Sequence, residues 1–168
     1  MNRSFMMMLA SAAAAVSLEA QTANPLVTEL KQAYTNTKTK FTKLAEKMPD
    51  EAYSFKATPE VRPFGANIAH IADSALRACS GVNGEQKTGT AGTKTAKADI
   101  VAALKEAFAE CDKAWDSVRD PLEMTTGARP RTKLGALAGN TAHTEEEYGY
   151  NAVYLRLKGI VPPSSEGR

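Results

Sequence analysis

Apolar residues recur at helical spacing in four separate stretches of this 168-residue chain, and no other pattern restricts its fold as much. Segments that contain proline or glycine interrupt these stretches, and no part shows the apolar–polar alternation of a β-strand over a useful length. Helices are predicted over residues 24–48, 64–82, 95–118 and 132–159. Because amphipathic helices must cover their apolar faces against one another, the sequence predicts an all-α four-helix bundle over residues 24–165.

The helix ends carry their usual signals. Asn24 can cap the first helix and Pro25 suits its first turn, whereas Gly159 follows the last helix. The connections 50–63 and 120–131 are predicted to be irregular, and the Gly-, Thr- and Lys-rich segment 81–95 is predicted to be a mobile surface loop. The buried face of the first helix is expected to contain Leu26, Leu30, Ala33, Thr37, Phe41, Leu44 and Met48.

The first twenty residues have the layout of a secretory signal peptide. Arg3 gives a basic start, residues 5–18 are apolar, and Ala20 is a small residue suited to cleavage. A cut after Ala23 and an uncleaved anchor are alternatives, because Leu18 is imperfect at the third position before the cut. We expect a periplasmic or secreted protein with no stable membrane span after cleavage, since no other segment is long and apolar enough.

Composition argues against a nucleic-acid partner. The chain has 21 basic and 19 acidic residues, and cleavage after Ala20 would remove one of each, leaving a net charge of +2. Charges of both signs are interspersed, which is unlike the basic surface of a nucleic-acid-binding protein. The remaining 148 residues (168 minus 20) suit one domain with a single core.

The chain has only two histidines, and each has a carboxylate one helical turn away. Asp73 follows His70 by three residues, and Glu147 follows His143 by four, so each pair shares a helix face. Imidazole and carboxylate groups together are common ligands for divalent zinc, iron and nickel. Against this stand two ordinary roles: a half-buried histidine satisfied by its surroundings, and an exposed His–Glu ion pair. Asp73 could orient the His70 ring and is not expected to bind a metal directly.

The last predicted helix carries a polar stripe beside its apolar face. A polar stripe of this kind is how internal sites are built in helical bundles. Glu145 and Glu146 point away from Glu147 and are expected to be solvated, with one of them a candidate acid at the rim of the site. Tyr150 is either a hydrogen-bond donor to a bound molecule or an aromatic residue with a surface hydroxyl. The stripe consists of Asn140, His143, Glu147, Tyr150 and Tyr154.

Two segments resemble the DinB/YfiT-like family. One is ATPEVRPFG at residues 57–65, which leads into IAHIAD at 68–73, and the other runs from Ala142-His143 to the YLRLKGIVPPSS at 154–165. The likeness extends over residues 25–165. Members of that family are four-helix bundles that bind a divalent metal through one histidine on the second helix and a His-x-x-x-His pair on the last. By position, these ligands correspond to His70, His143 and Glu147 here.

The resemblance also bears on function. The third family histidine is replaced by Glu147, which leaves a His/His/Glu set that is still competent for a divalent metal such as zinc, nickel or iron. The family implies a metal-dependent enzyme acting on a small-molecule substrate, since its members include transferases and isomerases with a thiol co-substrate. Because such thiols are chiefly cytosolic, the export signal leaves a hydrolase open as well. The alternative is a non-catalytic periplasmic binding module with a degenerate metal site. A homodimer through an exposed helix face is compatible with both.

The two cysteines, Cys79 and Cys111, invite a disulfide in an exported protein. If the segment 81–95 were a simple hairpin, its centre near residue 89 would place Cys79 opposite residue 99. That pairing disfavours the bridge. Cys111 is expected in the core, at helical spacing with Phe108 and Trp115.

Overall fold

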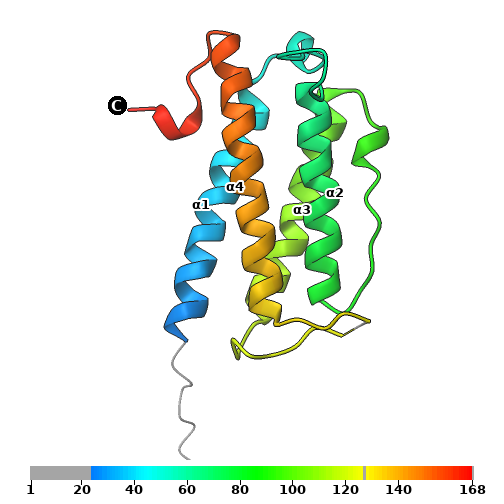
Figure 1. Ribbon diagram of the computed structural model, residues 1–168, viewed down its shortest axis with the longest axis vertical. Coiled ribbons are helices and arrows are strands. Elements are labelled where there is room, and N and C mark those ends of the chain that lie inside the picture. The colour runs from blue at the N-terminus through cyan, green and yellow to red at the C-terminus, as the bar shows by residue number, and fades with distance from the viewer. Residues whose placement is uncertain (1–23, 127, 168) are drawn as a thin grey trace, which may run out of the picture.

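The four predicted helices form one bundle in a computed structural model of the protein, which describes residues 24–126 and 128–167 (Figure 1). Within these residues there is no named strand, and an isolated bridge joins Met124 and Thr132. The prediction of an all-α bundle is confirmed. The predicted signal peptide, residues 1–20, lies outside the described residues. The helices are α1 (Pro25–Lys47), α2 (Phe64–Val82), α3 (Lys97–Ser117) and α4 (Lys133–Leu157).

Local capping explains the helix ends. The Asn24 side chain accepts hydrogen bonds from the backbone N–H groups of Leu26 and Val27, as the sequence predicted for α1. Thr132 caps α4 in the same way, by accepting from the N–H of Gly135. Gly159, just beyond α4, has a φ of 71°, a left-handed conformation that favours glycine.

Contacts between side chains fix the directions of the helices. Lys31 of α1 pairs with Asp116 of α3, whereas Glu46, farther along α1, pairs with Lys105, so α1 and α3 are antiparallel. In contrast, α2 and α3 run in the same direction: their early residues Gly65 and Ile100 are neighbours, as are their later residues Cys79 and Cys111. Figure 1 shows the same arrangement, with α1 and α4 rising and α2 and α3 descending.

The segment between α2 and α3 makes this parallel arrangement possible, because it runs back along α2 (Figure 1). The Asp73 carboxylate accepts hydrogen bonds from the N–H groups of Ala91 (2.9 Å) and Gly92 (3.0 Å), and Ala91 is buried. Residues 84–88 are exposed as expected for a surface loop. The expectation of a surface loop is nevertheless wrong at Ala91, which is buried, and the hydrogen bonds of Ala91 and Gly92 to the Asp73 side chain tie this part of the segment to α2.

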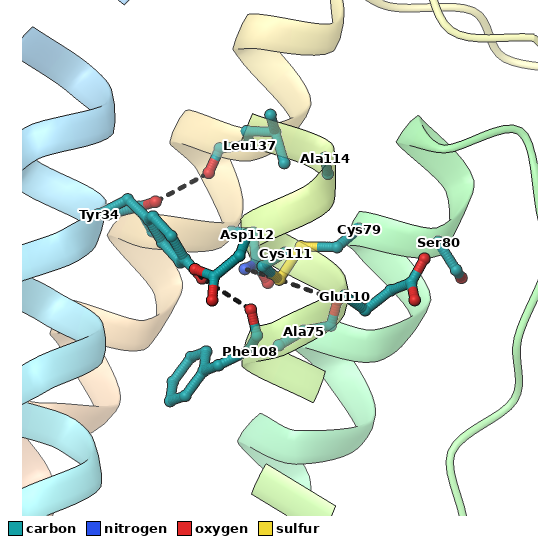
Figure 2. Close-up of a disulfide and its surroundings, with 12 residues drawn as sticks. Tyr34, Ala75, Cys79, Ser80, Phe108, Glu110, Cys111, Asp112, Ala114 and Leu137 are labelled. Carbon is teal, nitrogen blue, oxygen red and sulfur yellow. Dashed lines mark hydrogen bonds between the residues drawn. A yellow bond between two sulfur atoms is a disulfide. The ribbon is translucent and has the colours of Figure 1, made fainter. Parts of the chain in front are cut away.

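A disulfide joins Cys79 of α2 to Cys111 of α3, with 4.8 Å between their Cα atoms (Figure 2). The sequence pattern disfavoured this bridge only because a hairpin was assumed between α2 and α3. Since α2 and α3 are parallel, the relevant quantity is the distance of each cysteine from the start of its helix. Cys79 lies 15 residues after Phe64 and Cys111 lies 14 residues after Lys97, so both are at the same height.

The core lies between the four helices. Leu134, Leu137 and Leu155 of α4 are buried, but the face of α1 is shifted in its first half. Leu26 is 51 % exposed, and Val27 and Tyr34 are buried in place of Leu26 and Ala33. The Tyr34 ring stacks on Trp115 with 5.6 Å between ring centroids, and its hydroxyl donates to Asp112. These two contacts explain why the face of α1 that carries Tyr34 is the buried one. None of the helices in the described residues is long and apolar enough to serve as a membrane span.

Candidate metal centre

The three predicted ligands come together between α2 and α4. His70 lies in the second turn of α2, and His143 and Glu147 lie one turn apart in α4. The two helices are antiparallel neighbours, because His70 faces His143 and the earlier residue Asn67 faces the later residue Asn151. His143 and Glu147 therefore both point from α4 toward His70.

The spacing of the two imidazole nitrogens fits a single ion. The Nε2 atoms of His70 and His143 are 3.1 Å apart, and the two rings are nearly perpendicular, with an interplanar angle of 85°. Two ligands about 2.1 Å from one metal, at angles of 90–109°, are about 3.0–3.4 Å from each other. Taking one ligand atom from each residue, the His70, His143 and Glu147 atoms all lie within 4.8 Å of one another. These residues could hold a metal ion.

The surroundings of Glu147 also fit a cation. This residue is only 8 % exposed, yet within the described part of the chain its carboxylate forms no ion pair or hydrogen bond with another side chain or a backbone N–H. No unpartnered side-chain oxygen in the described residues is fully buried, so this carboxylate keeps some contact with solvent while it has no charged partner among them. A divalent cation between Glu147 and the two imidazoles would supply that partner.

The electrostatics of His70 favour its neutral form. Burial lowers the pKa of His70 below its usual value, and the positive charge of Arg62 lowers it further, while Glu147 acts in the opposite direction. Metal ions bind the unprotonated imidazole nitrogen, so a lowered pKa keeps this ligand available at neutral pH.

Asp73 does not belong to the site. Its carboxylate accepts from the backbone of Ala91 and Gly92 in the connection to α3, and the expectation that it orients the His70 ring is wrong. The sequence placed Asp73 correctly on the helix, but a position three residues from His70 faces the segment between α2 and α3, here called the crossover segment.

The acidic residues before Glu147 have different environments. Glu145 is half-buried rather than solvated, because it accepts from the Thr37 hydroxyl and pairs with Lys40 of α1. Glu146 is exposed as predicted, and its carboxylate lies 3.9 Å from Nδ1 of His143. It also accepts a hydrogen bond of 3.0 Å from the hydroxyl of Tyr150, which is 55 % exposed.

A cavity of about 460 Å³ opens beside Glu147. Asn67 and Tyr154 contribute to its lining, and Arg62 lies in the segment before α2, where its backbone carbonyl accepts from the Tyr154 hydroxyl. Arg62 and Asn67 were not predicted as site residues from the sequence. Asn67 precedes His70 by three residues, so the helical spacing used for Asp73 could have identified it if applied toward the N-terminus.

Similarity to known proteins agrees with this architecture. The sequence profile described as the DinB superfamily matches residues 33–150. The chain belongs to the DinB superfamily. The resemblance found in the sequence is thereby confirmed, and this DinB-superfamily protein has its candidate ligands on the helices expected from it. A crystal structure of a DinB-like protein from Bacillus cereus ATCC 10987 is similar, with a TM-score of 0.66.

That likeness concerns the fold alone. The two proteins share 19 % sequence identity, and the match covers 80 % of this chain and 93 % of the other. No curated protein is significantly similar to the chain. The chemistry of this DinB-superfamily member therefore has to be argued from its own residues.

Proposed function

We propose that the protein binds one divalent metal ion, zinc, nickel or iron, through His70, His143 and Glu147. The observation that carries this proposal is the convergence of three ligand-competent groups, of which the Glu147 carboxylate has no other partner among the described residues. Its ligand set resembles the two-histidine, one-carboxylate sites of zinc hydrolases and non-haem iron proteins.

We further propose that the site acts on a small molecule bound in the adjacent cavity. A divalent metal supplies Lewis acidity, which lowers the pKa of a water or thiol nucleophile to near neutrality. The residues of the chain supply the rest: Tyr154 and Asn67 shape the cavity, and the buried Glu147 faces it. A volume of about 460 Å³ lies within the range of small-molecule sites.

Export of the protein is part of the proposal. It is supported by the signal-peptide pattern of residues 1–20 and by the buried Cys79–Cys111 disulfide, since disulfides persist mainly in oxidising compartments. Cell fractionation and N-terminal sequencing test it. A mature protein that begins at Gln21, or at Asn24 after the alternative cut, is expected outside the cytoplasm, and an unprocessed cytoplasmic protein would contradict it.

Export bears on the reaction class. The thiol-dependent transferase implied by the family needs a low-molecular-weight thiol, and such thiols are chiefly cytosolic. Hydrolysis by an activated water therefore suits an exported protein better. The competing function is a non-catalytic binding module, for which the two imidazoles would share a hydrogen bond across the 3.1 Å between them.

Metal analysis separates these two functions. The purified protein is expected to hold about one equivalent of zinc, nickel or iron, and His143→Ala and Glu147→Gln are expected to lose it. Glu106→Gln is the matched control, because Glu106 is an exposed carboxylate of α3 away from the site. A wild-type protein that contains no metal and binds none on dialysis against these ions would exclude the metal-dependent function.

A further inference from the structure

The cavity beside Glu147 has walls of a particular character. Its lining is mainly apolar, with Val61 from the segment before α2 and Tyr150, Val153 and Tyr154 from α4. Val61, Tyr150 and Val153 are 38 %, 55 % and 53 % exposed, so three large apolar side chains face solvent at one opening. Apolar groups gathered around a concave surface are typical of a site for an organic molecule rather than for a bare ion.

One cation lies in this apolar lining. Arg62 lines the cavity, and its charge is near enough to act on His70. Among the described residues, the Arg62 guanidinium forms no ion pair or hydrogen bond, whereas its backbone carbonyl is held at 2.7 Å by the Tyr154 hydroxyl. The backbone of Arg62 is thus fixed to α4 while the charged end of its side chain remains available.

An acidic residue of the same lining does not occupy that guanidinium. Glu60 also lines the cavity, but among the described residues its carboxylate forms no ion pair with Arg62. Glu147, the other carboxylate of the lining, faces the two histidines. A fork-shaped guanidinium without a carboxylate partner is well suited to bind one from a ligand.

From this arrangement we infer that the cavity binds a small organic acid, with its apolar part against Val61, Tyr150 and Val153 and its carboxylate on Arg62. This inference names the substrate class of the proposed function and rests on it for the reaction. It makes Arg62 a specificity-determining residue, because a neutral analogue of the same shape cannot pair with the guanidinium.

Calorimetric titration with two probes tests the inference. 4-Phenylbutyrate and its neutral amide, 4-phenylbutyramide, have nearly the same shape and differ in charge. On the zinc-loaded protein the acid is expected to bind about tenfold more tightly than the amide. In Arg62→Gln the acid should lose about that factor, while the affinity for the amide should change by less than about twofold.

The control variant is Arg77→Gln. Arg77 is an α2 residue whose charge also acts, more weakly, on His70, but it does not line the cavity. Arg77→Gln should leave the affinities for both the acid and the amide unchanged. Arg62→Gln keeps the backbone carbonyl that binds Tyr154, and an unchanged melting temperature would show that it folds.

The outcomes are separable from those of the metal test. Acid binding that depends on Arg62 in a protein unable to hold metal would support the inference and contradict the proposed function. An acid preference that persists in Arg62→Gln but disappears on chelation would place the carboxylate on the metal and overturn the inference. Failure of both probes to bind would overturn it as well.

Discussion

The Nε2 atoms of His70 and His143 lie 3.1 Å apart, although 73 residues separate them in the sequence. The antiparallel packing of α2 and α4 brings them together, and Glu147 completes the cluster from the next turn of α4. Two imidazoles at this distance can share one metal ion or one hydrogen bond. A shared metal ion would involve Glu147, whereas a hydrogen bond between the two imidazoles would not. Glu147 is therefore the most informative residue to change.

Added zinc should raise the melting temperature of the wild-type protein. A ligand at about 100 times its Kd stabilises the native state by about 2.7 kcal/mol, which corresponds to roughly 5–10 °C for a domain of this size. Glu147→Gln should lose most of that shift. Thermal denaturation with zinc and with a chelator measures it, and equal shifts in the two proteins would remove Glu147 from the ligand set.

Glu146→Gln should weaken metal binding without removing it. The Glu146 carboxylate lies 3.9 Å from Nδ1 of His143, on the ring edge away from His70, where a carboxylate orients the imidazole and increases its basicity. A loss of about tenfold in zinc affinity is expected from such outer partners. Competition with a chromophoric chelator measures the affinity. Tyr150→Phe, which removes only the other hydrogen bond of Glu146, is the control and should have little effect.

The sequence was sufficient to predict the helices, because periodicity depends on spacing within one segment, whereas the ligand set of His70, His143 and Glu147 followed from the family resemblance. Periodicity placed α2 at residues 64–82, as observed. The direction of α3 was not predictable in this way. The 14 residues from 83 to 96 can extend over about 46 Å, whereas the 19 residues of α2 rise about 29 Å, so the segment is long enough either to turn or to run back.

Contacts between residues that are distant in the sequence determine the features that helical spacing does not predict. Asp73 holds Ala91 and Gly92 against α2, and the resulting parallel helices bring Cys79 and Cys111 together. Arg62 was missed for a similar reason. It lies outside any helix, and it reaches the cavity because its carbonyl is bound by Tyr154, which is 92 residues away. Neither contact follows from a periodic pattern.

Gly89→Ala should destabilise the protein by about 1–3 kcal/mol. A Cβ at residue 89 would overlap the Asp73 carboxylate that holds the crossover segment. Gly81→Ala is the control, because a Cβ there has no neighbour within 4 Å and alanine favours a helix. Urea denaturation of both variants measures the difference. Equal stability of the two would mean that the crossover does not lie against Asp73.

Glu110→Gln should lower the stability by about 1–2 kcal/mol at neutral pH and much less in acid. Glu110 is 6 % exposed and accepts from Lys87 Nζ (2.9 Å) and Asn83 Nδ2 (2.6 Å), and these bonds, Lys87 first, lower its pKa. With the pKa lower in the folded than in the unfolded state, the stabilisation is complete above about pH 4.5 and is lost as the pH falls through the folded-state pKa.

Urea denaturation of the wild type and Glu110→Gln at several pH values measures this effect. The difference between the two should narrow steadily below about pH 4.5. Glu106→Gln, one turn earlier on the exposed face of α3, should match the wild type throughout. A difference that stays constant down to pH 3 would show that the charge of Glu110 is not what holds Asn83 and Lys87.

Replacing both cysteines, Cys79→Ser with Cys111→Ser, should lower the free energy of unfolding by about 3–4 kcal/mol. The bridge closes a loop with a sequence separation of 32, and restricting a loop of that length in the unfolded chain accounts for this amount. Because both cysteines are fully buried, a reductant should react only as the protein unfolds, so the native protein should titrate no free thiol. Chemical denaturation of the oxidised wild type, the reduced wild type and the double variant compares the three. The reduced wild type should resemble the double variant, and equal stability of the oxidised and reduced forms would mean that the parallel packing of α2 and α3 owes nothing to the bridge.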